Sequence, residues 1–182
     1  MTAPTQNQPE LARIHRSIKS KFKDKKLIFG SGLVGAKIVF VSEMPGEFEQ
    51  KESKALAGIS EKTLHQILKT IGIDKKKVYI TNAVKYTPQS GTAISPKELK
   101  SHSNFLKEEI RTLAPTVVVT LGTLALNGVG LRQPLDNVHG RTFNFGTYTL
   151  VPTYHPGHAA TNPQIKQTIQ ADLAKVKELL KK

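Results

Sequence analysis

The sequence contains no cysteine, which excludes disulfides, thiolate zinc sites and iron–sulfur clusters held by cysteine. It also lacks long hydrophobic runs, because no apolar stretch approaches the roughly 18 residues that a membrane-spanning helix requires. The first 15 residues, "MTAPTQNQPELARIH", hold no apolar core of the kind that a secretory signal needs. We therefore expect a soluble protein without a signal peptide or a membrane span.

Acidic residues are scarce, with 14 Asp and Glu against 27 Lys and Arg, and the formal net charge is +13. Only five of the basic residues are arginine, so most of the charge sits on lysines, which suit phosphates as mobile point charges. A surplus of this size favours a polyanionic partner such as a nucleic acid. The alternative is a basic surface that only keeps the protein soluble.

The hydrophobic pattern predicts alternating strands and helices in a chain of 182 residues, which is about one domain. Short β-branched runs predict strands at 37–43, 77–82, 116–122 and 147–153. Amphipathic spacing predicts helices at 11–23, 60–72, 95–114 and 162–182, after a flexible tail at 1–10. Capping residues mark the helix ends: Ser60, Ser95 and Asn162 at the starts, and Gly72 as a stop.

Three of the four strands are apolar on both faces, which is typical of a parallel sheet covered by helices on both sides. The expected fold is α/β, a three-layer α/β/α sandwich with a central four-stranded parallel sheet. Ligands of such sheets bind beyond the carboxyl ends of the strands. That rule selects four loops: "EMPGEFEQ", "NAVKYTPQSG", "GTLALNG" and "YHPGHAATNP".

Two short motifs have ordinary explanations. The glycine pattern at 30–35 matches GxGxxG but comes before a strand, whereas a dinucleotide site requires it after one, so we expect a simple connection. His155 and His158 are three apart, yet Pro156 and Gly157 between them argue against a helix that would align the rings. With no Asp, Glu or Cys nearby in sequence, we expect no metal site.

Polar residues at the strand ends are candidates for chemistry. Glu43, Glu47 and Glu49 surround a Pro-Gly turn, and cations nearby would keep such carboxylates ionised. Asn82 ends the second strand, and its amide offers both a donor and an acceptor to the edge of a base. The alternatives are surface charge for the glutamates and a backbone cap for Asn82. For His155, structural and catalytic roles are equally open at this point.

Four segments occur in an order and spacing that resemble the uracil-DNA glycosylase superfamily, and most closely its family 4 branch. They are "VFVSEMPGEFEQ", "YITNAVKYTP", "PTVVVTLGTLAL" and "LVPTYHPGHAATNPQIK". The family has a motif like GE(A/G)PG, then TN-x-VK-C, then P-x-hydrophobic-LG, then pTyHP with NP a few residues on. The resemblance covers roughly residues 27 to 182, and it implies one glycosylase-like domain at 11–182.

The resemblance implies roles for matching positions. Catalysis would fall to His155, as donor to uracil O2, with Glu49 or Glu43 stabilising the sugar cation and orienting water. The uracil pocket would contain Asn82, Met44, Leu56 and Ser42. Contact with DNA would involve Gly157, His158, Ala159, Thr161, Asn162 and Lys85. Leu56 stands where the family usually has a phenylalanine that stacks on uracil, Ser42 replaces a glycine, and Met44 replaces a small residue.

The resemblance also predicts a cofactor that the residues contradict. Family 4 holds a 4Fe–4S cluster on four cysteines, and here Tyr86 stands at the third position and His102 near the fourth, while the first pair would fall around 13–18. We therefore expect no cofactor and no metal, with aromatic or apolar packing in place of the cluster. Since the cluster is not expected to perform the hydrolysis, its loss need not abolish activity.

The expected function is base-excision repair: monofunctional hydrolysis of the N-glycosidic bond of a flipped uracil in double- or single-stranded DNA, leaving an abasic site. The enzyme would be a monomer without membrane contact, cytoplasmic, and associated with the nucleoid in a bacterium. Met44 and Leu56 leave open a glycosylase for hypoxanthine or xanthine. A catalytically weak uracil-DNA-binding protein and a general nucleic-acid binder are further alternatives.

Overall fold

The computed structural model describes residues 4–89 and 92–181, with side chains described from Asn7 onward. Within these ranges, six strands form one sheet in the order β1-β3-β2-β4-β6-β5. They are β1 (Ser31–Gly32), β2 (Ile38–Ser42), β3 (Val78–Asn82), β4 (Val117–Leu121), β5 (Phe143–Asn144) and β6 (Thr149–Thr153). The four central strands are parallel, as predicted, while β1 and β5 are short antiparallel strands at the two edges. The sheet is therefore six-stranded, not four-stranded.

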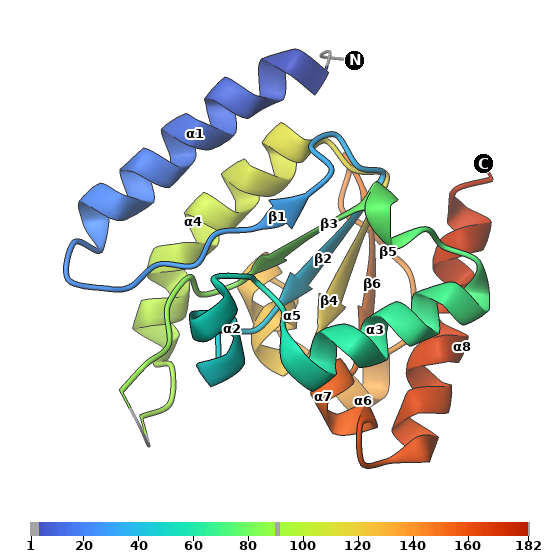
Figure 1. Cartoon of the computed structure of the whole chain (residues 1–182). Helices are drawn as coiled ribbons and strands as arrows, with labels where there is room; N and C mark the ends of the chain where they lie inside the picture. The colour runs from blue at the N-terminus through green and yellow to red at the C-terminus, as the bar shows by residue number, and fades with distance from the viewer. Residues whose placement is uncertain (1–3, 90–91, 182) are drawn as a thin grey trace.

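Helices lie on both faces of this sheet and complete the expected three layers (Figure 1). The longer ones are α1 (Pro4–Lys21), α3 (Gly58–Ile71), α4 (Pro96–Leu113) and α8 (Pro163–Leu179). The shorter ones are α2 (Glu47–Glu52), η1 (Lys75–Lys77), α5 (Thr123–Val129), α6 (Leu135–Val138) and α7 (Pro156–Ala159). None of the helices in the described ranges is long and apolar enough to cross a membrane.

Alternating side chains of the strands supply two separate cores. In β2, Val39 and Val41 pack toward α1, α4 and α5, whereas Ile38 and Phe40 pack toward α3 and α8. Successive strand residues point to opposite faces, so a strand that is buried throughout must be apolar at every position. This explains why the pattern predicted the central strands within two residues at either end.

Helix α1 begins at Pro4, not at Leu11, and so corrects the tail expected at 1–10. Its buried residues are Asn7, Leu11, Ile14 and Ile18, a spacing that places them on one face against α4. The first of these lies inside the stretch expected as a tail. Packing of this stripe therefore extends the helix into a segment whose polar composition suggested no structure; residues 1–3 lie outside the described ranges.

Three of the four predicted caps are confirmed. The Ser95 side chain accepts from the N–H of Glu98 and completes the capping box, Asn162 accepts at the start of α8, and Gly72 ends α3 with φ of 73°. Ser60 does not cap α3, because the helix starts two residues earlier after Ala57. The division of the chain into domains stays a prediction.

Candidate active site

The carboxyl ends of β2 and β6 lie at one edge of the sheet, where the chain leaves each strand and passes into α2 and α7 (Figure 1). A cavity of about 390 Å³ lies at this edge. Its lining consists of Ser42, Glu43, Met44, Pro45, Gly46, Glu49, Ser60, Thr87, Pro88, Gln89, Thr92 and His155. The fold therefore brings together residues of the first, second and fourth strand-end loops that the sequence selected.

His155 lies two residues beyond the end of β6 and caps α7, and two contacts determine where its proton lies. Its Nδ1 atom accepts a hydrogen bond from the N–H of Gly157 at 3.1 Å. A neutral imidazole has one donor and one acceptor nitrogen, so the proton is on Nε2. That atom lies 3.0 Å from Oγ of Ser42. A one-turn helix does follow His155, contrary to the sequence argument, because proline is favoured at the first helical position.

Burial lowers the pKa of His155 below its ordinary value, while the nearby Glu43 carboxylate opposes this shift. Burial penalises the charged imidazolium more than the carboxylate favours it. The ring is therefore neutral at pH 7 and can donate from Nε2 to an acceptor in the cavity.

Glu43 lies between that cavity and a second one of about 210 Å³, and His155 also lines both. Its Oε1 atom accepts from the N–H of Leu124 at 3.0 Å, in the first turn of α5. Gly122 has φ of 97°, and a β-carbon there would overlap the Glu43 carboxylate. Within the described residues Oε2 of Glu43 has no hydrogen-bond partner, so one carboxylate oxygen remains for a water molecule or a substrate.

Glu49 is used differently, because both of its oxygens hold backbone amides. Oε2 accepts from Gly46 at 3.0 Å, and Oε1 accepts from Ala57 at 2.9 Å. These bonds tie the two ends of the segment that carries α2. Glu49 lines the cavity, but its lone pairs mainly hold the cavity wall together.

Asn82 ends β3 opposite Ser42 in the register of the sheet. It is fully buried, and neither Oδ1 nor Nδ2 has a partner among residues 4–89 and 92–181. An unpaired buried amide costs about 1–3 kcal/mol for each group that loses its water. Because Asn82 lies beside Ser42, which lines the cavity, its amide is suited to a ligand that supplies both a hydrogen-bond donor and an acceptor.

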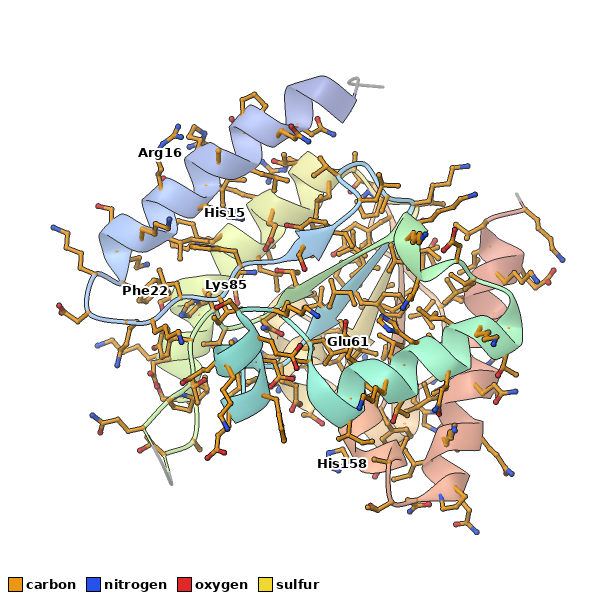
Figure 2. The ribbon with its side chains drawn as sticks, viewed as in Figure 1. His15, Arg16, Phe22, Glu61, Lys85 and His158 are labelled. Atoms are coloured by element: carbon orange, nitrogen blue, oxygen red, sulfur yellow. The ribbon has the colours of Figure 1, made fainter. Side chains whose placement is uncertain are left out.

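The structure corrects three of the candidate residues. Lys85 is 1% exposed, with its ammonium bound inside the fold, so it cannot reach a phosphate (Figure 2). Ala159 is 3% exposed and packs in the core between α3, α7 and α8. Leu56 is 4% exposed and belongs to the same core instead of lining the cavity, so it does not take the place of the phenylalanine that stacks on uracil; Met44 does line the cavity.

The remaining DNA-contact candidates lie near the surface around α7. His158 is exposed (Figure 2). Thr161 and Asn162 are also exposed, and Gly157 is partly exposed. The Asn162 side chain also accepts from the backbone of Gln164 and Ile165, which leaves its amide nitrogen free to donate outward. The loop thus presents small and polar groups beside His155.

Seven cavity residues were not among the candidate site residues predicted from the sequence, namely Pro45, Gly46, Ser60, Thr87, Pro88, Gln89 and Thr92. Thr87, Pro88, Gln89 and Thr92 come from the loop after β3, and Ser60 comes from α3. The sequence placed all but two of these residues in strand-end loops. Thr92 lies one residue beyond such a loop, and Ser60 was predicted only as a helix cap. The Thr87 hydroxyl donates to the carbonyl of Pro45 at 2.5 Å, which joins the first and second loops across the cavity.

Tyr86 and His102, which stand at the third and near the fourth of the cluster positions that the resemblance implies, pack together with the ring of Phe22. Phe22 and His102 stack with centroids 4.3 Å apart and planes 3° apart, and Tyr86 packs against both. The Tyr86 hydroxyl donates to Glu98 at 2.9 Å. Thiolate donors are missing, and no group of three or more His, Asp or Glu in the described ranges is arranged to hold a metal. These residues do not fit the cluster, and aromatic packing replaces it, as expected.

Comparison with known proteins agrees with the motifs. The model of the uracil DNA glycosylase superfamily matches residues 29–179. A type-4 uracil-DNA glycosylase of Saccharolobus solfataricus is 31% identical over 170 residues, covering 88% of this chain and 78% of the relative. One of Thermotoga maritima is 31% identical over 161 residues, covering 86% and 84%. The chain belongs to the uracil DNA glycosylase superfamily.

Proposed function

We propose that this protein hydrolyses the N-glycosidic bond of uracil in DNA and leaves an abasic site. The observation that carries the proposal is a neutral His155 with its proton on Nε2, at the same strand-end edge as the unpaired amide of Asn82. Uracil presents carbonyl acceptors and an N3–H donor, so it could satisfy both side chains. Cytosine has no N3–H, and a site with unpaired polar groups rejects such a base strongly.

Bond cleavage moves negative charge onto the pyrimidine and positive charge onto the sugar. A hydrogen bond from Nε2 of His155 to O2 stabilises the departing anion. Glu43, with one free carboxylate oxygen, is the better placed glutamate to stabilise the sugar cation and orient the water that attacks C1′. Glu49 supports the cavity wall instead.

Several features support a monofunctional, base-flipping enzyme. No lysine lines either cavity within the described residues, so no amine is placed to form a covalent link with the sugar. A base must leave the stack to reach His155, which costs a few kcal/mol and less in mismatches or single strands. The small residues Gly157 and Ala160 offer no large apolar side chain to fill the space that the flipped base leaves in the stack. Uracil should therefore be released faster from U·G pairs and single strands than from U·A pairs.

We further propose that the enzyme acts as a monomer.

The test is an oligonucleotide with one uracil, incubated with the protein and then cleaved by alkali at abasic sites. His155→Ala should slow single-turnover release by about 100-fold or more. Asn82→Ala should slow it by about 10- to 100-fold. His65→Ala, on α3 away from the cavity, is the matched control and should retain the rate. If alkali produces no strand break with U·G, U·A or single-stranded substrate, the proposal is wrong.

Met44 favours one second candidate, a glycosylase for another deaminated base such as hypoxanthine or xanthine. Its partly buried side chain lines the cavity, where the family usually has a small residue. A panel of damaged-base oligonucleotides decides between the two. Faster release of a purine than of uracil would favour the second candidate, whereas binding of uracil-DNA without an abasic product would indicate a lesion-binding protein.

A further inference from the structure

The lysine of the TNAVK motif forms a buried ion pair with α4. Nζ of Lys85 lies 2.6 Å from Oε2 of Glu109, and the two side chains are 1% and 0% exposed. Removing both charges from water costs about as much as their attraction returns, so a buried pair is weak evidence for a stabilising role. The position of the pair in the fold therefore calls for another explanation.

All three protons of the Lys85 ammonium are used, and two of them bind the end of β3. Besides Glu109, Nζ donates to Oγ1 of Thr81 at 2.5 Å and to the backbone carbonyl of Asn82 at 2.8 Å. The Thr81 hydroxyl donates in turn to Oε1 of Glu109 at 2.9 Å. The ion pair thus holds two successive residues of β3, one of which is Asn82.

The same backbone segment is bound to the cavity wall on its other side. The N–H of Ala83 donates to the carbonyl of Ser42 at 2.9 Å, and the N–H of Val84 donates to the carbonyl of Glu43 at 3.0 Å. Ser42 in turn contacts Nε2 of His155. Residues 82–85 therefore join the ion pair to three groups of the candidate active site.

The Asn82 amide has no partner of its own in the described chain, so no side-chain hydrogen bond orients it in the free protein. Its direction depends on the backbone that carries it and on the packing around it. A group that reads a base must be held within a fraction of an ångström of its working position. The contact from Nζ to the Asn82 carbonyl supplies such a restraint at the residue itself.

We propose that the Lys85–Glu109 pair is a positioning device that holds Asn82 for recognition of uracil. Lys85 does not touch the base or the DNA; it acts through the Asn82 backbone. The proposal rests on the proposed function, because it assumes that Asn82 binds the base.

The first test replaces the pair by an apolar one, Lys85→Met with Glu109→Leu. Since buried pairs can be exchanged for apolar residues without loss of stability, the double variant should melt at or above the wild-type temperature. Single-turnover uracil release should fall by about 10- to 100-fold, and the inhibition constant of free uracil should rise by about 10-fold. A purely structural pair would leave both values unchanged in the folded protein, and that result overturns the proposal.

Tyr86→Phe is the matched control. Tyr86 directly follows Lys85, and its hydroxyl donates to Glu98 on α4, the helix that also carries Glu109. The substitution removes this hydrogen bond and leaves every contact of Asn82 in place. It should keep the wild-type rate and inhibition constant. If the double variant does not fold, Thr81→Val removes only the hydroxyl between the two charges, and should slow release by about 3-fold with a matching rise in the inhibition constant.

A double-mutant cycle with Asn82→Ala separates this proposal from the proposed function. If Lys85 acts through Asn82, the apolar pair should slow the Asn82→Ala enzyme by less than about 3-fold. A further loss of 10-fold or more would show an independent action and overturn the positioning role alone. If Asn82→Ala releases uracil at the wild-type rate, the role of Asn82 fails, and the positioning role fails with it.

Discussion

Nε2 of His155 and Oγ of Ser42 lie 3.0 Å apart, so the proton proposed to bind the base is already engaged in the free protein. The resemblance places a glycine at this position in related enzymes, where that contact cannot form. A base that binds Nε2 must therefore displace or share the Ser42 hydroxyl. The contact links substrate recognition to a residue that differs from the family pattern.

Ser42→Gly should raise the rate of uracil release from U·G by about 5-fold, since a hydrogen bond worth about 1 kcal/mol no longer has to be given up. Single-turnover kinetics with excess enzyme measures this directly. If the rate falls by 5-fold or more, Ser42 orients the His155 ring for catalysis instead of competing with the base.

The rate of uracil release should remain constant from pH 8 to below the ordinary histidine pKa of about 6.5, because burial lowers the pKa of His155. Removing the Glu43 charge with Glu43→Gln should shift the acid limb to lower pH, since that carboxylate raises the pKa. His158→Ala should shift it the opposite way, because His158 lowers the pKa of His155. Single-turnover rates measured across the pH range give the midpoint of the acid limb for each variant, even where the variant is slower than the wild type. An acid limb at or above pH 6.5 contradicts the assignment.

The two cavity glutamates should respond differently to removal of charge. Glu49→Gln leaves one of two backbone amides without an acceptor, which costs about 1–3 kcal/mol and lowers the melting temperature by several degrees. Glu43→Gln can keep its bond to Leu124, so it should melt like the wild type but release uracil about 100-fold more slowly. Thermal unfolding and single-turnover rates are measured on the same samples. The reverse pattern would assign the water-orienting role to Glu49.

His102 should make the protein sensitive to acid, because burial lowers its pKa to about 4. The unfolded chain binds a proton near pH 6.5 and the folded chain only near pH 4. Neutral His102 therefore leaves the free energy of unfolding at its full value above about pH 6.5. Up to about 3 kcal/mol of that free energy is lost as the pH falls to about 4. His102→Phe keeps an aromatic ring against Phe22. It should reduce the fall in melting temperature between about pH 6.5 and about pH 4.

Tyr86→Phe is the control for this prediction, because it changes the same aromatic group without removing a residue that titrates in that range; the pKa of Tyr86 is raised to about 12. It should retain the acid sensitivity. His102→Phe should also melt higher at neutral pH, since neither ring nitrogen of His102 has a partner within residues 4–89 and 92–181. An unchanged slope in His102→Phe would assign the acid sensitivity to other groups.

The sequence alone determined the layers of the fold and the edge of the sheet where the candidate site lies. Apolar strands buried on both faces and capped helices are local patterns, and periodicity reports them directly. The order of the strand-end motifs then selected Glu43, Asn82 and His155. The short edge strands β1 and β5 were not predicted from the sequence, because a strand of two residues is too short to show a periodic pattern.

Only the tertiary structure decided what individual polar side chains do. Lys85 belongs to the TNAVK motif, and the resemblance implied a contact with DNA, yet its partner Glu109 is 24 residues away on a packed helix. Glu43 and Glu49 look equivalent in sequence, but only their backbone partners show which one keeps a free oxygen. The physical reason is that hydrophobic periodicity depends on neighbours along the chain, whereas hydrogen bonding and desolvation depend on whatever the fold brings into contact.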